Sequence, residues 1–204
     1  MQREINMVAK HAILLHAKSF LTSPVAYLAS LRRLCQMGTQ VERWSDLANF
    51  DPAWDARTAM IAVMIPKNSA VLEFGSGREQ LEKFLPEGCT YQPCDLAPRS
   101  ARTLVCNLNE GFPALPQRYD VIVFSGVIEY IHDLDALFRH VRASCTSCIV
   151  SYAATDDLDC VATRMRNGWV HHYAVTELVA LFEKAGFTVA ETARWQAQTI
   201  FRLA

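Results

Sequence analysis

The chain has 204 residues, 51% of them hydrophobic, which is enough to bury a core of its own. Its 20 basic and 21 acidic side chains leave a formal net charge of −1. This balance gives no basic surface for a phosphate backbone, so we expect no nucleic acid partner. There is neither a run of about 18 apolar residues nor an apolar segment with a cleavage site, so we expect no membrane span, no secretion signal and a soluble, cytoplasmic protein.

The first part of the chain, residues 1–50, is predicted to be helical because apolar residues recur at spacings of three and four. Ser23-Pro24 interrupts this pattern and predicts the start of a second helix. We expect an N-terminal helical cap over 1–50, followed by the main domain over 51–204. With Trp44 and Trp54, the cap could cover a ligand as a lid or form the surface of a homodimer.

The main domain alternates predicted strands and helices, which favours an α/β fold with a mostly parallel sheet. Helices are predicted over 78–85 and 127–143, and another is expected to start at Thr176 as its cap and to end at Gly186. The predicted strands are 70–74, 90–94, 102–106, 119–124, 148–152, 187–194 and 198–203.

A glycine turn comes after the first predicted strand, in the sequence Glu73-Phe74-Gly75-Ser76-Gly77. Such a turn lets the backbone approach a ligand and directs free N–H groups toward it. The dinucleotide fingerprint of a nicotinamide site needs a third glycine where Gln80 stands, and no phosphate-loop lysine comes next. Glu73 and Glu79 would repel a pyrophosphate but attract a cationic ligand.

The glycine turn resembles the first motif of the class I S-adenosylmethionine-dependent methyltransferases, in particular the small bacterial enzymes that act on small molecules. The resemblance covers about 70–190. It implies a Rossmann-like, seven-stranded, mostly parallel sheet with an antiparallel last strand. It also implies that Gly75, Ser76 and Gly77 approach the cofactor and that Glu73 supports its amino-acid end.

The ends of the next three predicted strands extend the resemblance. It implies that Asp95 binds the ribose hydroxyls of S-adenosylmethionine, that Asn107 binds the adenine edge and that Ser125 lies near the methionine portion. The additional residues implied to bind the cofactor at these strand ends are Leu96, Leu108 and Gly126. The chain departs from the family pattern at Glu79, where the third glycine is usual, and at Tyr130, where histidine is common.

Methyl transfer from a sulfonium needs above all an acceptor oriented in line, which can supply roughly 7–11 kcal/mol of the barrier reduction. A base is optional and is expected in the long loop after 148–152. His171, His172 and Tyr173 are the candidate catalytic residues there, although each histidine could instead bond backbone or be solvated. The neighbouring aspartates are interpreted as a solvated loop, and no metal is expected.

The sequence therefore predicts an S-adenosylmethionine-dependent methyltransferase that acts on an O or N atom of a small-molecule acceptor. Two alternatives stay open. One is an inactive cofactor-binding or scaffold protein of the same fold. The other is an NAD-dependent oxidoreductase, which Gln80 and the acidic residues near the turn disfavour.

Overall fold

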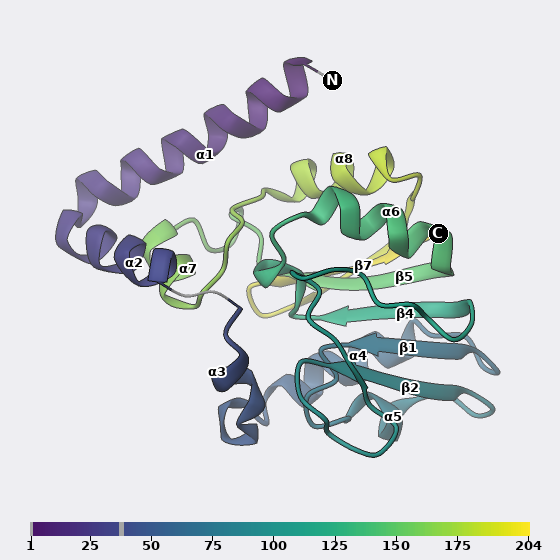
Figure 1. The fold of residues 1–204 in the computed structure, drawn as a ribbon. Helices are drawn as coiled ribbons and strands as arrows, with labels where there is room; N and C mark the ends of the chain where they lie inside the picture. The colour runs from purple at the N-terminus through teal and green to yellow at the C-terminus, as the bar shows by residue number, and fades with distance from the viewer. Residues whose placement is uncertain (1, 37–38) are drawn as a thin grey trace.

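A seven-stranded sheet forms the centre of the molecule in the computed structural model, which describes residues 2–36 and 39–204 (Figure 1). The strands are β1 (Ala70–Phe74), β2 (Thr90–Asp95), β3 (Leu104–Val105), β4 (Tyr119–Ser125), β5 (Cys145–Tyr152), β6 (Val189–Trp195) and β7 (Gln198–Leu203). Their order in the sheet is β3-β2-β1-β4-β5-β7-β6. Only β7 runs antiparallel to its neighbours. This confirms the predicted Rossmann-like fold with an antiparallel last strand.

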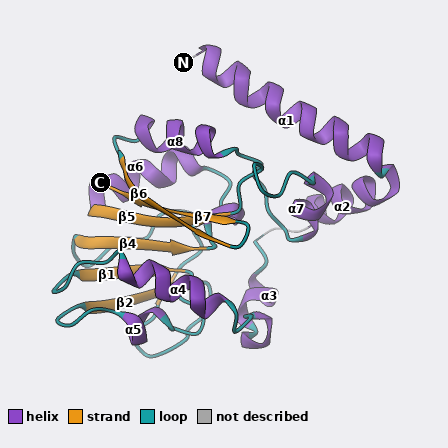
Figure 2. Ribbon diagram, turned by 180° about the vertical axis from the view of Figure 1, so that it is seen from behind, coloured by secondary structure: helices purple, strands orange, loops and turns teal. Residues whose placement is uncertain are grey.

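Helices cover both faces of the sheet, as the views from the two sides show (Figures 1 and 2). They are α4 (Trp54–Val63) and α5 (Leu81–Phe84) on one face and α6 (Leu134–Ser144) and α8 (Val175–Lys184) on the other. The short helix α7 (Val161–Arg166) lies beyond the carboxyl ends of the strands (Figure 1). Successive strand residues point to opposite faces. Ile122 and Phe124 of β4 accordingly pack with α6 and α8, whereas Val121 and Val123 pack with α4. The continuous apolar run of β4 is explained by this burial on both sides.

Two helices begin elsewhere than the sequence predicts. The segment predicted as one helix over 127–143 starts with the short 3-10 helix η2 (Ile128–Tyr130), and α6 begins only after Asp133, whose carboxylate accepts from Ala136 N at 2.8 Å. The helix starts after Asp133 because the carboxylate of this residue caps the free N–H group of Ala136 in the first turn. Thr176 lies inside α8 and does not cap it; instead the Glu177 carboxylate accepts from Ala174 N at 2.8 Å.

The N-terminal helices α1 (Gln2–Thr22) and α2 (Pro24–Gln36) lie beside α7, away from the sheet (Figure 2). Leu15 packs there against Val161 and Met165. Several apolar side chains of α1 and α2 remain exposed, including Ile13, Leu14, Leu21, Val25 and Leu28. A homodimer through these helices stays a prediction. None of the helices in the described ranges is long and apolar enough to cross a membrane.

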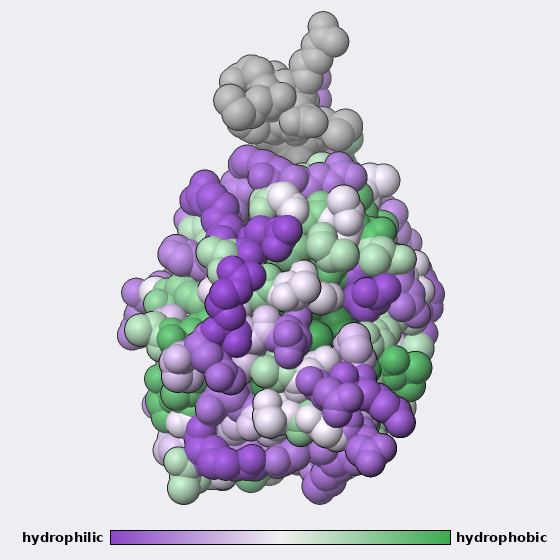
Figure 3. Space-filling model, turned by 90° about the vertical axis from the view of Figure 1, so that its right-hand side faces the viewer, coloured by the Kyte–Doolittle hydropathy of each residue, from purple (hydrophilic) through white to green (hydrophobic). Residues whose placement is uncertain are grey.

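The parallel strands all end at one edge of the sheet, on the side of α3 (Val41–Ser45) and α7 (Figure 1). The face at the opposite end, drawn in Figure 3, carries hydrophilic side chains spread between smaller hydrophobic areas. In doubly wound sheets, ligands bind outside the carboxyl ends of the strands. The edge beside α3 and α7 is therefore where a site is expected.

Candidate active site

A cavity of about 430 Å³ lies at this carboxyl edge, within the size range of small-molecule sites. Every residue predicted to bind a cofactor lines it: Glu73, Gly75, Ser76, Gly77, Asp95, Leu96, Asn107, Leu108, Ser125 and Gly126. Since β7 is reversed, the turn between β6 and β7 also reaches this edge, and residues 195–198 line the cavity too. The fold thus brings the predicted cofactor residues together.

The glycine loop is tied to the end of β2. Gly75 N and Ser76 N donate to Cys94 O at 2.8 and 3.1 Å, and Gly77 N donates to the Asp95 carboxylate at 2.8 Å. Gly77 has φ +50°, and a side chain there would overlap the Phe50 ring. Only glycine therefore fits between β1 and the aromatic residue that covers it.

Glu79, which replaces the usual third glycine, does not line the cavity. It keeps the left-handed backbone of a glycine position, with φ +54°. Its carboxylate accepts from Ser100 Oγ at 2.9 Å and from Thr103 Oγ1 at 3.2 Å. These bonds offset the backbone strain of about 1–2 kcal/mol. Glu79 therefore fastens the loop after β2 and leaves the cavity unobstructed.

Asp95 is buried at the end of β2, and its carboxylate is already heavily bonded. Besides Gly77 N, it accepts from Arg99 at 3.0 Å and from Ala97 N at 3.2 Å. A carboxylate offers about four lone-pair positions. About one lone-pair position therefore remains to accept a hydrogen bond from a ribose hydroxyl. Asp95 could bind both ribose hydroxyls only if one of its three present donors moved away.

Asn107 is similarly engaged by its surroundings. Its amide donates to the Glu110 carboxylate at 2.8 Å, and its oxygen accepts from Thr39 Oγ1 at 3.3 Å and from Asn109 N at 3.1 Å. One amide hydrogen remains for a ligand. Leu108 beside it lines the cavity with an apolar surface.

Glu73 carries a buried carboxylate at the end of β1, only 3% exposed. The Tyr91 hydroxyl donates to it at 2.5 Å. Burial raises the pKa of Glu73 to about 8, even though the Tyr91 bond and the charge of Arg57 act in the opposite direction. A cationic ligand group beside Glu73 would restore its charged form.

Arg57 of α4 is a buried cation in the same cavity, 6% exposed. It donates to Ser125 Oγ at 3.0 Å, to Ser125 O at 3.2 Å and to Gln198 Oε1 at 2.8 Å. Its guanidinium also lies over the rings of Trp54 and Trp195. A Cβ on Gly126 would come within 2.7 Å of this guanidinium, so glycine is what allows Arg57 to reach the end of β4. Two of its five N–H donors remain for a ligand.

Residues 39–50, which we call the strap, cross over the cavity between the N-terminal helices and α4. The strap is bonded to three loops of the carboxyl edge. Arg99 donates to Ser45 O at 2.9 Å and to Trp44 O, and Arg43 donates to Asn167 O at 3.0 Å. Thr39 makes the bond to Asn107 given above. The lid interpretation of Trp44 and Trp54 agrees with this arrangement, since both line the cavity.

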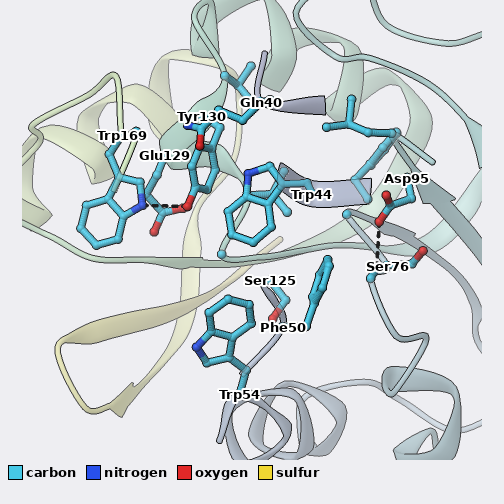
Figure 4. A pocket seen from close by; sticks show the side chains of 18 of the residues that line it. Gln40, Trp44, Phe50, Trp54, Ser76, Asp95, Ser125, Glu129, Tyr130 and Trp169 are labelled. Atoms are coloured by element: carbon cyan, nitrogen blue, oxygen red, sulfur yellow. Dashed lines mark hydrogen bonds between the residues drawn. The ribbon is translucent and has the colours of Figure 1, made fainter. Parts of the chain in front are cut away.

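Aromatic side chains form the wall under the strap (Figure 4). The ring of Trp44 lies 5.4 Å from that of Tyr130 and 5.6 Å from that of Phe50, measured between centroids. The Trp169 indole donates to the Tyr130 hydroxyl at 3.1 Å. Tyr130 thus occupies the place of the common histidine as part of this wall, and burial raises its pKa to about 12.

A family model described as a methyltransferase domain matches residues 43–192. The chain belongs to this family. It is a member of the class I, S-adenosylmethionine-dependent methyltransferase family. No curated protein matches the chain in sequence.

Solved structures of other methyltransferases share its fold. The 1,6-didemethyltoxoflavin-N1-methyltransferase of Burkholderia thailandensis, solved with 1,6-didemethyltoxoflavin and S-adenosylhomocysteine, has a TM-score of 0.62 at 17% identity, with 89% of each chain covered. A structure described as a putative O-methyltransferase, from Nostoc punctiforme, has a TM-score of 0.64 at 14% identity over 92% of this chain and 71% of that one. CalO1, a methyltransferase in calicheamicin biosynthesis solved with S-adenosylhomocysteine, has a TM-score of 0.56 at 16% identity over 74% and 53%.

The fold does not bring His171, His172 or Tyr173, the predicted catalytic residues, into the lining of the cavity. His171 Nε2 donates to Ile131 O at 2.6 Å. His172 accepts from Arg164 Nε at 3.1 Å, and burial lowers its pKa to about 3. Tyr173 packs against the apolar core. The alternative interpretation of these histidines, as groups with local structural bonds, agrees with this geometry.

Arg164 explains why the loop after β5 takes this path. Its fully buried guanidinium donates to Ala153 O at 2.5 Å, to His171 O at 3.0 Å and to the Tyr152 hydroxyl at 2.9 Å. It also lies 5.0 Å from the centre of the Trp169 ring. The hydrogen bonds of Arg164 therefore fix the course of the loop, and its contact with Trp169 helps to hold that ring in the wall of the cavity. No sequence motif pointed to this role.

The aspartates of the loop make separate contacts. Asp156 accepts from Val175 N at 2.7 Å, Asp157 pairs with Arg194 at 2.5 Å, and Asp159 pairs with Lys18. Across residues 2–36 and 39–204, no group of three or more His, Cys, Asp or Glu side chains is arranged to hold a metal ion.

Proposed function

We propose that this methyltransferase transfers the methyl group of S-adenosylmethionine to an O or N atom of a small-molecule acceptor. The observation that carries the proposal is that a buried acidic side chain, Glu73, and a buried basic side chain, Arg57, line the same cavity as the glycine loop. The amino-acid end of the cofactor has an ammonium and a carboxylate. The Glu73 carboxylate would accept hydrogen bonds from the ammonium, and the free N–H donors of Arg57 would donate to the carboxylate.

The placement of the rest of the cofactor is inferred from the order of the strands. With its amino-acid end between β1 and β4, its adenosine extends over β2 and β3, where Asp95, Leu96 and Leu108 line the cavity. Ser76 Oγ, buried and without a partner among the described residues, is a further group that a ligand would satisfy. The methyl group then faces the half of the cavity beyond β4.

The reaction is an in-line displacement. A lone pair on the acceptor attacks the methyl carbon, the carbon–sulfur bond breaks, and its electron pair stays on sulfur as the neutral thioether. The acceptor loses its proton before or during this step. The protein's main contribution is to hold the two reactants in line and to exclude water under the strap.

The inactive scaffold remains the second candidate. The favouring observation is the heavily bonded Asp95, which has about one free lone-pair position. Glu79 gives the scaffold no support, because it leaves the cavity unobstructed. An NAD-dependent oxidoreductase is less suited to the site, since Gln80 stands where the dinucleotide fingerprint needs its third glycine.

Calorimetric titration separates these candidates. The full-length protein is titrated with S-adenosylmethionine, S-adenosylhomocysteine and NAD, and formation of S-adenosylhomocysteine is then followed with a panel of phenols, amines and heterocycles. We expect both sulfur ligands to bind, NAD not to bind, and at least one acceptor to be methylated. Absence of binding by either sulfur ligand would refute the proposed function, whereas binding without transfer to any acceptor would support the scaffold.

A further inference from the structure

The half of the cavity beyond β4 has features that the cofactor does not account for. Its lining comes from η2 after β4, from the loop after β5 and from the turn between β6 and β7. In the sheet order these elements lie on the far side of β4 from β2 and β3. Because the adenosine is expected over β2 and β3, this half is left for the acceptor.

Besides Ser76 Oγ, which is assigned to the cofactor, two buried polar atoms of cavity-lining residues lack a partner among the described residues, one in η2 and one in the strap where it contacts Tyr130. One is Glu129 Oε2, a hydrogen-bond acceptor, and the other is Trp44 Nε1, a donor. Glu129 is only 1% exposed, and its other oxygen accepts from Ala153 N at 3.1 Å. Leaving such a group unsatisfied is costly, and more so when it is charged. A ligand with both a donor and an acceptor would satisfy the pair.

The walls of this half are flat and aromatic. Trp44 and Trp169 both contact Tyr130, from the strap and from the loop after β5, and all three are drawn in Figure 4 with Glu129. Aromatic faces of this kind favour a planar ring by stacking or edge contacts. A permanent cation is a poorer match for these aromatic walls, because the guanidinium of Arg43 already lies 4.5 Å from the centre of the Trp44 ring.

On the basis of the proposed function, we propose that the acceptor is a planar aromatic or heteroaromatic molecule with an acidic O–H or N–H, and that Glu129 is the catalytic residue that receives its proton. The acceptor's O or N lone pair forms the new bond to the methyl carbon. The carbon–sulfur pair goes to sulfur, and the acceptor proton passes to Glu129 Oε2 and then to water. Burial raises the pKa of Glu129, which suits a group that must hold a proton at the end of the transfer.

Binding to the full-length protein saturated with S-adenosylhomocysteine tests the recognition. The probes are hydroxyquinoline, quinoline without the hydroxyl, decahydronaphthol as a non-planar alcohol, and benzyltrimethylammonium as a cation. We expect hydroxyquinoline to bind at least tenfold more tightly than the other three. Equal affinities, tighter binding of the cation or no binding of hydroxyquinoline would overturn the proposal.

The variant Glu129→Gln tests the proton transfer, with the exposed Glu183→Gln as the matched control. We expect Glu129→Gln to bind S-adenosylmethionine within about twofold of the wild type, to lose at least tenfold in hydroxyquinoline affinity, and to lose the rise of methylation rate with pH. The control should keep all three properties. An unchanged pH–rate profile in Glu129→Gln would overturn the catalytic role. A wild type that does not bind S-adenosylmethionine would instead overturn the proposed function.

Discussion

Single residues decide which ligands this cavity can hold, and the buried charges are the most informative. Glu73, Arg57 and Glu129 all line one cavity, each at most 6% exposed. Isolated charges are costly to bury, so their grouping around a cavity indicates ligand groups of complementary charge. Only Glu73 was predicted from the sequence, because it belongs to a motif.

The first prediction concerns Arg57. In Arg57→Met we expect the affinity for both S-adenosylmethionine and S-adenosylhomocysteine to fall by about 10- to 150-fold, the loss of hydrogen bonds to a charged group worth about 1.5–3 kcal/mol. Methylthioadenosine, which lacks the amino-acid end, should bind the variant and the wild type equally. Calorimetry measures all three affinities. The exposed Arg102→Met serves as control, and an equal loss for methylthioadenosine would assign Arg57 a purely structural role.

At the scale of elements, sequence patterns predicted the residues at the strand ends better than the segments that cross over them. The residues predicted to bind the cofactor lie at or directly after the ends of β1 to β4, so locating the strands was enough to place them around one cavity. The strap and the loop after β5 depend on bonds between distant parts of the chain, such as Arg43 with Asn167 and Arg99 with Ser45. No local pattern reveals such bonds. That His171 and His172 lie outside the lining of the cavity could not be predicted for this reason, since Arg164 sets the course of their loop.

The second prediction concerns this loop. Arg164→Met removes a buried donor from the carbonyls of Ala153 and His171 and should lower the free energy of unfolding by about 3 kcal/mol or more. Arg166→Met changes an exposed neighbour on the same helix, whose one side-chain bond within the described part of the chain is to the Thr163 hydroxyl, and should stay within about 0.5 kcal/mol of the wild type. Urea unfolding measures both. Equal stabilities of the two variants would contradict the role given to Arg164.

For the molecule as a whole, the buried acids connect stability to pH. Glu73 has an ordinary pKa of 4.5 and a folded-state pKa of about 8, so the folded protein binds more protons than the unfolded chain between these values. Stability is therefore greatest below about pH 4.5 as far as Glu73 is concerned, and it is lost as the pH rises toward 8. The slope cannot exceed about 1.4 kcal/mol per pH unit for one proton.

The third prediction rests on that slope. Without ligand, Glu73→Gln should gain stability relative to the wild type as the pH rises from about 5 to about 8, because the amide has no proton to lose. Urea unfolding across this range gives the difference. Glu129 is unchanged in both proteins, so its own contribution cancels. A difference that does not vary with pH would show that Glu73 is charged in the folded protein without ligand.

All four tryptophans of the chain, Trp44, Trp54, Trp169 and Trp195, line the one cavity that holds the predicted cofactor residues. Indole emission depends on the polarity and the ring contacts of its surroundings. Since every indole of the protein borders the cavity, the intrinsic fluorescence of the chain is a label-free signal of occupancy. Trp54 and Trp195 flank Arg57, whereas Trp44 and Trp169 flank Tyr130. Single replacements by phenylalanine would therefore assign a spectral change to the surroundings of Arg57 or to those of Tyr130.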